Sequence, residues 1–131
     1  MENNFSHSLL SVAESRIRAD ALELGVRLPW YRSLPLSVIE VADLTVDGHP
    51  IPHSDMKFEI NGKSFSLDAL RELTDEVWYV LDSAFIVARV PLQAGRDHDI
   101  ALQLNLYPPY IPGLTWVTQA RRTIRAPRGE T

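Results

Sequence analysis

The clearest pattern in the chain is a strict alternation of apolar and polar positions over residues 99–106. The apolar positions are Ile100, Leu102, Leu104 and Leu106, and the residues between them are small or neutral and polar. A period of two puts alternate side chains on opposite faces of a strand. We therefore predict an antiparallel strand with one face on a core and the other toward solvent.

Two further alternating runs, residues 56–60 and 63–67, are joined directly by Asn61-Gly62. This dipeptide favours a type I′ turn, because both central positions of that turn need positive φ. The pattern predicts a β-hairpin. Asp47-Gly48 gives a second turn signal, after the β-rich residues 36–41 and 44–46.

The remaining runs complete an all-β pattern. Strand-like runs cover residues 77–81, 84–90 and 114–124, while residues 16–26 alternate imperfectly, so that a helix over 12–24 competes there. Leucines at helical spacing after Ser66, a possible N-cap, predict one short helix over about 67–74. About seven or eight short strands and one short helix predict an all-β fold, an antiparallel β-sandwich.

The domain organisation follows from the same patterns. The polar residues 1–15 predict a flexible N-terminal segment, residues 16–125 a single β-sandwich domain, and residues 126–131 a flexible tail.

Composition narrows the function classes. The chain has 131 residues and a formal net charge of -4, which argues against broad binding to phosphate backbones. Its one basic cluster, Arg121, Arg122, Arg125 and Arg128, is equally explained by a solvated strand face or tail. The absence of cysteine excludes disulfides and a thiol nucleophile and fits a cytoplasmic protein. Neither a signal peptide pattern nor an apolar run of the roughly 20 residues needed for a membrane span is present.

The histidines give little evidence of a metal or catalytic site. His49 and His53 lie four apart, but Pro50 and Pro52 prevent a helix, so the spacing fits exposed loop histidines better than a zinc site. His98 lies between two aspartates and could serve in acid–base chemistry, yet a surface charge cluster at a strand start explains it more simply.

Other chemical motifs are equally sparse. Glu72, Asp75 and Glu76 could supply the paired carboxylates of a glycosidase, but solvated charge at a helix end is the stronger interpretation. All the glycines are isolated, which argues against a phosphate-binding loop. We therefore expect no catalytic, cofactor-binding or metal-binding residues in this chain.

Two proline-rich segments, residues 28–35 and 107–112, carry aromatic residues that lie outside the predicted strands. Proline makes these loops stiff, and Trp, Tyr and Arg are enriched at binding hot spots. We predict a partner interface made of Trp30, Tyr31, Arg32, Tyr107 and Tyr110. An aromatic cap on one end of the sandwich is the competing interpretation for these rings. The aromatic residues within strand patterns, Phe58, Phe65, Trp78 and Phe85, are expected in the core.

The chain resembles the small β subunit of bacterial C-glycoside deglycosidases, also called C-deglycosylation enzymes. The resemblance covers residues 16–125 approximately. It lies in Leu28–Ser37 (LPWYRSLPLS), Val46–Gly48, Phe58–Lys63 (FEINGK), Leu67–Leu73, Glu76–Trp78, Gly95–His98 and Tyr110–Pro112.

The resemblance implies a β-sandwich that assembles with a larger catalytic α subunit. That α subunit would be a TIM barrel similar to sugar isomerases, carrying a divalent metal, typically manganese. The pair would cleave the C–C bond between an aglycone, typically a flavonoid, and a sugar in its 3-oxo form. In this interpretation the chain is a non-catalytic subunit of a lyase, and Trp30→Ala with Arg32→Ala should weaken assembly without disturbing the fold.

Two alternatives remain at this point. The chain could be a free-standing carbohydrate- or aromatic-binding module, whose exposed rings stack on its ligand. It could also be a small β-barrel enzyme with His98 as its base, which predicts activity from this chain alone.

Overall fold

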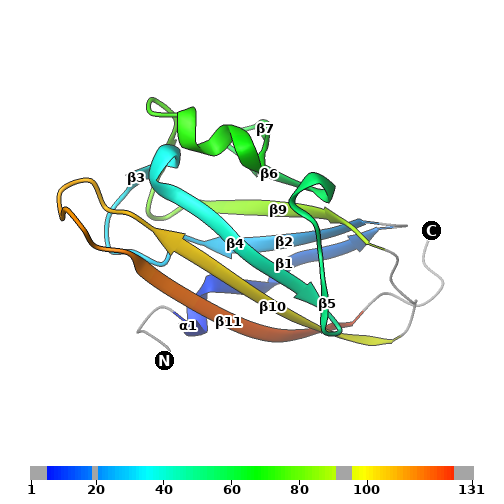
Figure 1. Cartoon of the computed structure of the whole chain (residues 1–131). Helices are drawn as coiled ribbons and strands as arrows, with labels where there is room; N and C mark the ends of the chain where they lie inside the picture. Colours follow the sequence, from blue (N-terminus) through cyan, green and yellow to red (C-terminus); the bar gives the residue numbers. More distant parts are fainter. Residues whose placement is uncertain (1–5, 19–20, 91–95, 126–131) are drawn as a thin grey trace.

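Two antiparallel sheets face each other and enclose the core (Figure 1). The structure is a computed structural model, and it describes residues 6–18, 21–90 and 96–125. One sheet has the strand order β1-β2-β9-β6-β7 and the other β11-β10-β4-β5, while β3 and β8 pair separately. The fold is therefore the predicted all-β sandwich.

The strands of the first sheet are β1 (Leu10–Arg18), β2 (Ala21–Arg27), β9 (Ser83–Arg89), β6 (Met56–Ile60) and β7 (Lys63–Ser66). Those of the second sheet are β11 (Trp116–Arg125), β10 (Asp97–Leu106), β4 (Ile39–Val46) and β5 (His49–Pro50), and the small pair is β3 (Leu34–Pro35) and β8 (Val77–Trp78). The helical elements are α1 (Ser6–Leu9) and the 3₁₀ helices η1 (Leu36–Val38), η2 (His53–Asp55) and η3 (Leu67–Glu72). Among the described residues, eight strands have four or more residues, as many as the sequence patterns indicate.

Both predicted tight turns are present. Asp47 and Gly48 have φ of 53° and 82°, and Asn61 and Gly62 have φ of 55° and 76°. Positive φ at both central positions is the conformation that a type I′ turn requires. These turns fix the β4–β5 and β6–β7 hairpins in register.

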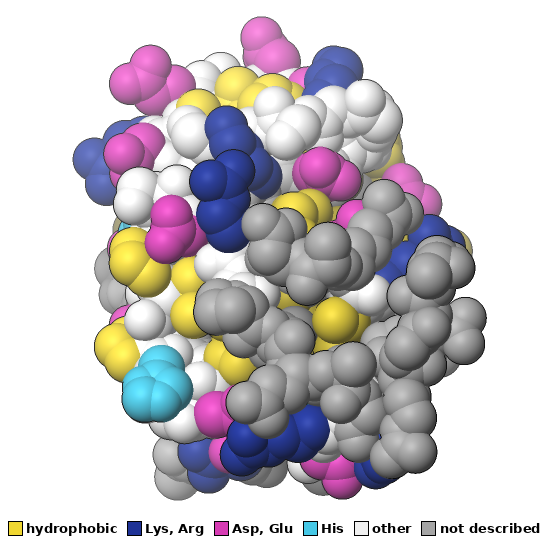
Figure 2. Space-filling model, turned by 90° about the vertical axis from the view of Figure 1, so that its right-hand side faces the viewer, with side chains coloured by type: hydrophobic (Ala, Val, Ile, Leu, Met, Phe, Trp, Pro, Cys, Tyr) yellow, Lys and Arg dark blue, Asp and Glu magenta, His cyan; other side chains and the backbone are white. Residues whose placement is uncertain are grey.

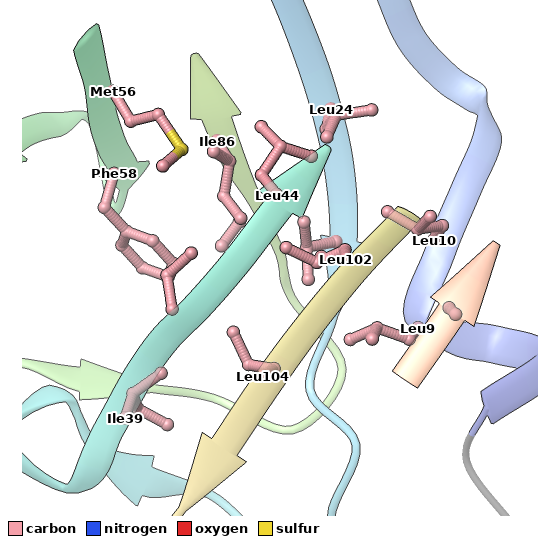
Figure 3. Close-up of a cluster of buried hydrophobic side chains, with 14 of the residues drawn as sticks. Leu9, Leu10, Leu24, Ile39, Leu44, Met56, Phe58, Ile86, Leu102 and Leu104 are labelled. Carbon is pink, nitrogen blue, oxygen red and sulfur yellow. The ribbon is translucent and has the colours of Figure 1, made fainter. Parts of the chain in front are cut away.

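The strongest alternation becomes the centre of the second sheet. β10 pairs with β11 over its whole length and with β4 on its other side. Its leucines point inward against side chains of the opposite sheet, such as Ile86 and Phe58 (Figure 3). Its intervening residues face outward, so each sheet presents one apolar and one solvated face.

The N-terminal prediction is wrong in part, because residues 6–15 form α1 and most of β1. Leu9 and Leu10 are buried in the core and anchor this segment. The pairing of β1 with β2 is irregular between Ser11 and Arg16. Ser15 bridges this irregularity, since its Oγ donates to the Ser11 carbonyl (2.7 Å) and accepts from Gly25 N (3.0 Å). The polar residues that resemble a disordered terminus therefore include one, Ser15, that hydrogen-bonds the backbone groups of a distorted strand. The predicted flexible residues 1–5 and 126–131 lie outside the described residues.

Three smaller predictions also need correction. The competing helix over 12–24 is absent, because the described part of this region forms β1 and β2. The helix predicted over 67–74 is the 3₁₀ helix η3, and Ser66 makes no side-chain cap. Phe85 is only partly buried, because it alternates with the core-facing positions of β9. Phe65, on the short edge strand β7, is partly buried but packs against the core as predicted.

Candidate partner-binding site

The two proline-rich segments meet at one end of the sandwich, as their similar composition suggested. Residues 28–33 connect β2 to β3, and residues 107–115 connect β10 to β11. The Trp30 Nε1–H donates to the Tyr110 hydroxyl at 2.5 Å, and the hydroxyl groups of Tyr110 and Tyr31 are 3.3 Å apart. Gly113, with φ of 81°, allows the second loop to turn back toward β11.

Tyr31, Arg32 and Tyr110 form an exposed cluster, which we call the aromatic patch. The Arg32 guanidinium lies 4.8 Å from the centre of the Tyr110 ring, a cation–π geometry. Tyr31 is 63% exposed and Tyr110 is 42% exposed. The three side chains thus order one another while leaving their outer surfaces free for a partner.

Trp30 has a different role from its neighbours. It is only 6% exposed, and its ring packs edge-on against Trp116 with centroids 5.2 Å apart. The prediction that Trp30 is a surface contact of the interface is therefore wrong. Trp30 instead caps the core and supports the patch from below. Because Trp30 is buried in this way, we now expect Trp30→Ala to destabilise the fold as well as the patch.

Tyr107 is half exposed but is held by another part of the molecule. Its hydroxyl donates to Glu40 Oε1 at 2.5 Å, and its backbone N–H donates to the Val38 carbonyl at 3.0 Å. The hydrogen bond to the Glu40 carboxylate raises the pKa of Tyr107. Tyr107 therefore borders the same end of the sandwich without joining the aromatic patch.

The phenols of the patch influence each other's ionisation. The hydrogen bond with Tyr110 is the main cause that raises the pKa of Tyr31. Burial acts to raise the pKa of Tyr110, but hydrogen bonds with Tyr31 and Trp30, together with the Arg32 charge, outweigh it and lower that pKa.

Sequence reasoning missed a third loop at this end. Residues 79–82 connect β8 to β9, and Val80 N donates to the Ser33 Oγ at 2.9 Å, which joins this loop to the first one. Tyr79 and Leu81 are exposed on it. The sequence signal for this loop is Asp82-Ser83, which follows a run of large apolar residues. These two polar residues mark a turn that already begins after Trp78, and not the end of a buried strand.

Exposed apolar side chains therefore concentrate at one end of the molecule. Of the eight large hydrophobic residues that are exposed within the described ranges, six lie on the three loops: Tyr31, Tyr79, Leu81, Tyr107, Tyr110 and Ile111. All four tyrosines of the chain are among them. A surface that gathers apolar residues in this way is typical of an interaction site.

His98 is buried, so its interpretation as part of a surface charge cluster is wrong. It is 3% exposed, and its Nδ1 lies 2.7 Å from Asp47 Oδ2. Asp47 Oδ1 also accepts the backbone N–H of Asp99 at 2.9 Å. These contacts hold the Asp47-Gly48 turn against the start of β10. Because the ring is enclosed, a substrate would reach His98 only after rearrangement, which weakens its case as a catalytic base.

The other candidate residues, His49, His53 and Glu76, are either exposed or held by neighbouring side chains. His49 and His53 are exposed, and within the described ranges no group of three or more His, Cys, Asp or Glu side chains could hold a metal ion. Glu76 accepts hydrogen bonds from Asn61 and Lys63, each at 2.9 Å, and these bonds lower its pKa. Glu76 thereby joins the β6–β7 turn to the start of β8.

The surface charge is mixed. On the face shown in Figure 2, basic and acidic side chains are interspersed rather than gathered into one basic area. In the part of the chain that the structure describes, no helix has the length and apolar character that crossing a bilayer requires. A β-sandwich with an apolar, tyrosine-rich loop end is an architecture typical of interaction domains.

Comparison with known proteins gives the family. The family model of the C-glycoside deglycosidase beta subunit matches residues 9–110. A C-glycoside deglycosidase beta subunit from Microbacterium trichothecenolyticum is 44% identical over 102 residues, which cover 76% of this chain and 78% of that protein. The chain therefore belongs to the C-glycoside deglycosidase beta subunit family, as its motifs indicated.

Two further relatives are similar over a shorter range. A C-glycoside deglycosidase beta subunit from Arthrobacter globiformis is 40% identical over 87 residues, covering 66% of both chains. A 3'-dehydrocarminate deglycosidase beta subunit from a Microbacterium species is 40% identical over 90 residues, again covering 66% of both chains.

Proposed function

We propose that this chain is the small β subunit of a heteromeric, cytoplasmic C-glycoside deglycosidase. Its relatives are named as beta subunits of deglycosidases, which supports a partner subunit for this chain too. The proposed partner is a TIM-barrel α subunit that carries the catalytic groups and a divalent metal, Mn²⁺. The β subunit has a structural, accessory role and shapes the complex.

The proposed reaction is the cleavage of the C–C bond between an aglycone and a 3-oxo sugar, with flavonoid-type aglycones as the substrate class. The ketone acidifies the neighbouring C–H, so that removal of this proton and elimination can expel the aglycone carbon. This chemistry makes the complex a carbon–carbon lyase. The catalytic base and the metal belong to the α subunit in this proposal.

The observation that carries the proposal is the concentration of exposed tyrosines and Arg32 on three loops at one end. Tyr and Arg are the residue types that contribute most at protein interfaces. The hydrogen bond from Trp30 to Tyr110 and the stacking of Arg32 hold the aromatic patch in place before binding. A preorganised patch loses less side-chain entropy when a partner binds, so it binds more tightly.

Co-purification with the α subunit tests this assignment. The double variant Tyr31→Ala/Arg32→Ala should co-elute with the α subunit at least tenfold less on size exclusion, since two central anchors are lost. The matched control is Val12→Ala/Arg89→Ala, which also removes one exposed apolar residue and one exposed arginine, from strands β1 and β9. The control should co-elute like the wild type.

Three results would contradict the proposal. Co-elution of the patch variant at the wild-type level would remove the aromatic patch from the interface. A wild-type chain that stays monomeric beside the α subunit and binds a sugar or aromatic ligand saturably would favour a free-standing module. C-deglycosylation by this chain alone would overturn the accessory role.

A further inference from the structure

The outward face of the second sheet carries a hydrogen-bonded row of side-chain amides. Gln119 Nε2 donates to Gln103 Oε1 (2.9 Å), and Gln103 Nε2 donates to Asn105 Oδ1 (3.2 Å). Asn105 Nδ2 then donates to Glu40 Oε1 (3.0 Å). We call Gln119, Gln103 and Asn105 the amide row. It crosses β11 and β10, and its last member contacts Glu40 on β4.

Glu40 fixes the direction of every amide in the row. Its carboxylate also accepts the Tyr107 hydroxyl, and the hydrogen bonds from Tyr107 and Asn105 lower the pKa of Glu40, so that it is ionised at neutral pH. An ionised carboxylate can only accept hydrogen bonds. Asn105 must therefore turn its amino group to Glu40, and each following amide must donate in the same direction. As a result, Gln119 keeps its carbonyl oxygen and one N–H available at the far end of the row.

That far end borders a hollow in the sheet surface. The strand register places Asp43, Gln103 and Gln119 side by side across three strands, and Thr45, Ala101 and Arg121 in the next row. These six residues, together with the buried Leu102 and Ala120, line a hollow of about 360 Å³. Ala101 has the smallest side chain of the six and forms the floor, because longer side chains flank it on both neighbouring strands. The volume lies within the roughly 300–1,000 Å³ of small-molecule sites.

The lining is chemically suited to hydroxyl groups. It combines two amides, a hydroxyl, a carboxylate and a guanidinium around a small apolar floor. Amides and hydroxyls both donate and accept, as a ligand hydroxyl does. A protein–protein interface core would instead be expected to present aromatic or large aliphatic side chains. Leu102, the large aliphatic residue of the lining, is buried in the core and does not present its side chain there.

We propose that the hollow binds a polyhydroxylated ligand such as a hexose, and that the amide row and Glu40 position Gln119 toward it. The row is already hydrogen-bonded, so little rotamer freedom is lost on binding. This proposal concerns a different surface from the aromatic patch and does not depend on the assignment of the chain as a subunit.

Titration of the ¹⁵N-labelled full chain with D-glucose tests the proposal by NMR. The side-chain amide signals of Gln103 and Gln119 should shift saturably, while that of Asn61, in the β6–β7 turn, should stay unchanged. Ala101→Leu fills the hollow and should weaken binding at least tenfold. Thr123→Leu, also on the outward side of β11 but outside the hollow lining, should bind like the wild type.

Two further variants keep the test decisive if Ala101→Leu fails to fold. Gln119→Met keeps the side-chain length without its hydrogen bonds, and it should also weaken binding at least tenfold. Glu40→Gln frees the row to reverse, so the Gln103 and Gln119 signals should move before any glucose is added, and binding should weaken several-fold. Shifts that do not saturate, or equal binding by Ala101→Leu, Gln119→Met and the wild type, would overturn the proposal.

Discussion

Replacing Trp30 by alanine should destabilise the fold rather than only weaken partner binding. The Trp30 ring is 6% exposed, packs against Trp116 and donates one hydrogen bond to Tyr110. Truncation of a buried Trp to Ala commonly costs about 3–5 kcal/mol, from lost transfer free energy and the cavity left behind. Tyr110 is partly exposed, so its hydroxyl can bind water after the change, and we expect a loss of ~4 kcal/mol in the free energy of unfolding.

This loss is large against the roughly 5–15 kcal/mol that stabilise a typical domain. It is measured by urea unfolding followed by circular dichroism, because the substitution itself alters tryptophan fluorescence. Trp30→Phe retains most of the buried ring and loses the indole N–H, so it should cost about 1–2 kcal/mol. Arg32→Ala removes an exposed cation–π contact and should change stability by less than about 1 kcal/mol.

The contrast between these variants tests the cap role of Trp30. If Trp30→Ala unfolds at the wild-type urea concentration yet fails to bind the α subunit, Trp30 is a surface anchor rather than a cap on the core. If both stability and binding fall, restoring the fold at lower temperature should restore binding only in part, because the variant keeps Tyr31, Arg32 and Tyr110 but lacks the hydrogen bond from Trp30 that holds Tyr110.

Two further substitutions test local features of the sandwich. Gly25→Ala should lower the free energy of unfolding by roughly 1–3 kcal/mol, because the new Cβ would lie 2.7 Å from the Glu14 Cβ; an unchanged urea midpoint would show that β1 moves away freely. The backbone N–H of Asp99, and then His98, lower the pKa of Asp47 below its ordinary value of 3.8, so its stabilising effect is complete above that pH and is lost as the pH falls through the lowered pKa. Asp47→Asn should therefore lose less stability than the wild type between about pH 6 and about pH 3, and equal losses in urea titrations would contradict this.

Local signals predicted the strands and turns well, because they depend on neighbours in the sequence. The Asn61-Gly62 turn needs two positive φ values, and the leucines of β10 need one buried face, so each pattern permits few structures. The N-terminal strand was missed because its anchors, Leu9 and Leu10, are only two residues in a polar stretch. Its distortion is stabilised by Gly25, a residue of another strand.

The candidate site was predicted in composition but not in detail. Stiff loops rich in Tyr, Trp and Arg indicated an interaction surface, and the structure brings Tyr31, Arg32 and Tyr110 together. The burial of Trp30 depends on Trp116, which is 86 positions later in the chain, and so no local pattern contains it. The same holds for His98, whose partner Asp47 lies on another hairpin.

The strand order has a consequence for how the protein folds during synthesis. β2 and β6 both need β9 as a neighbour, and β4 needs β10. A nascent chain that ends before residue 83 can form the β1–β2, β4–β5 and β6–β7 hairpins, but neither sheet. Both sheets therefore assemble late on the ribosome, and a chain released before β9 would leave apolar strand edges open to aggregation.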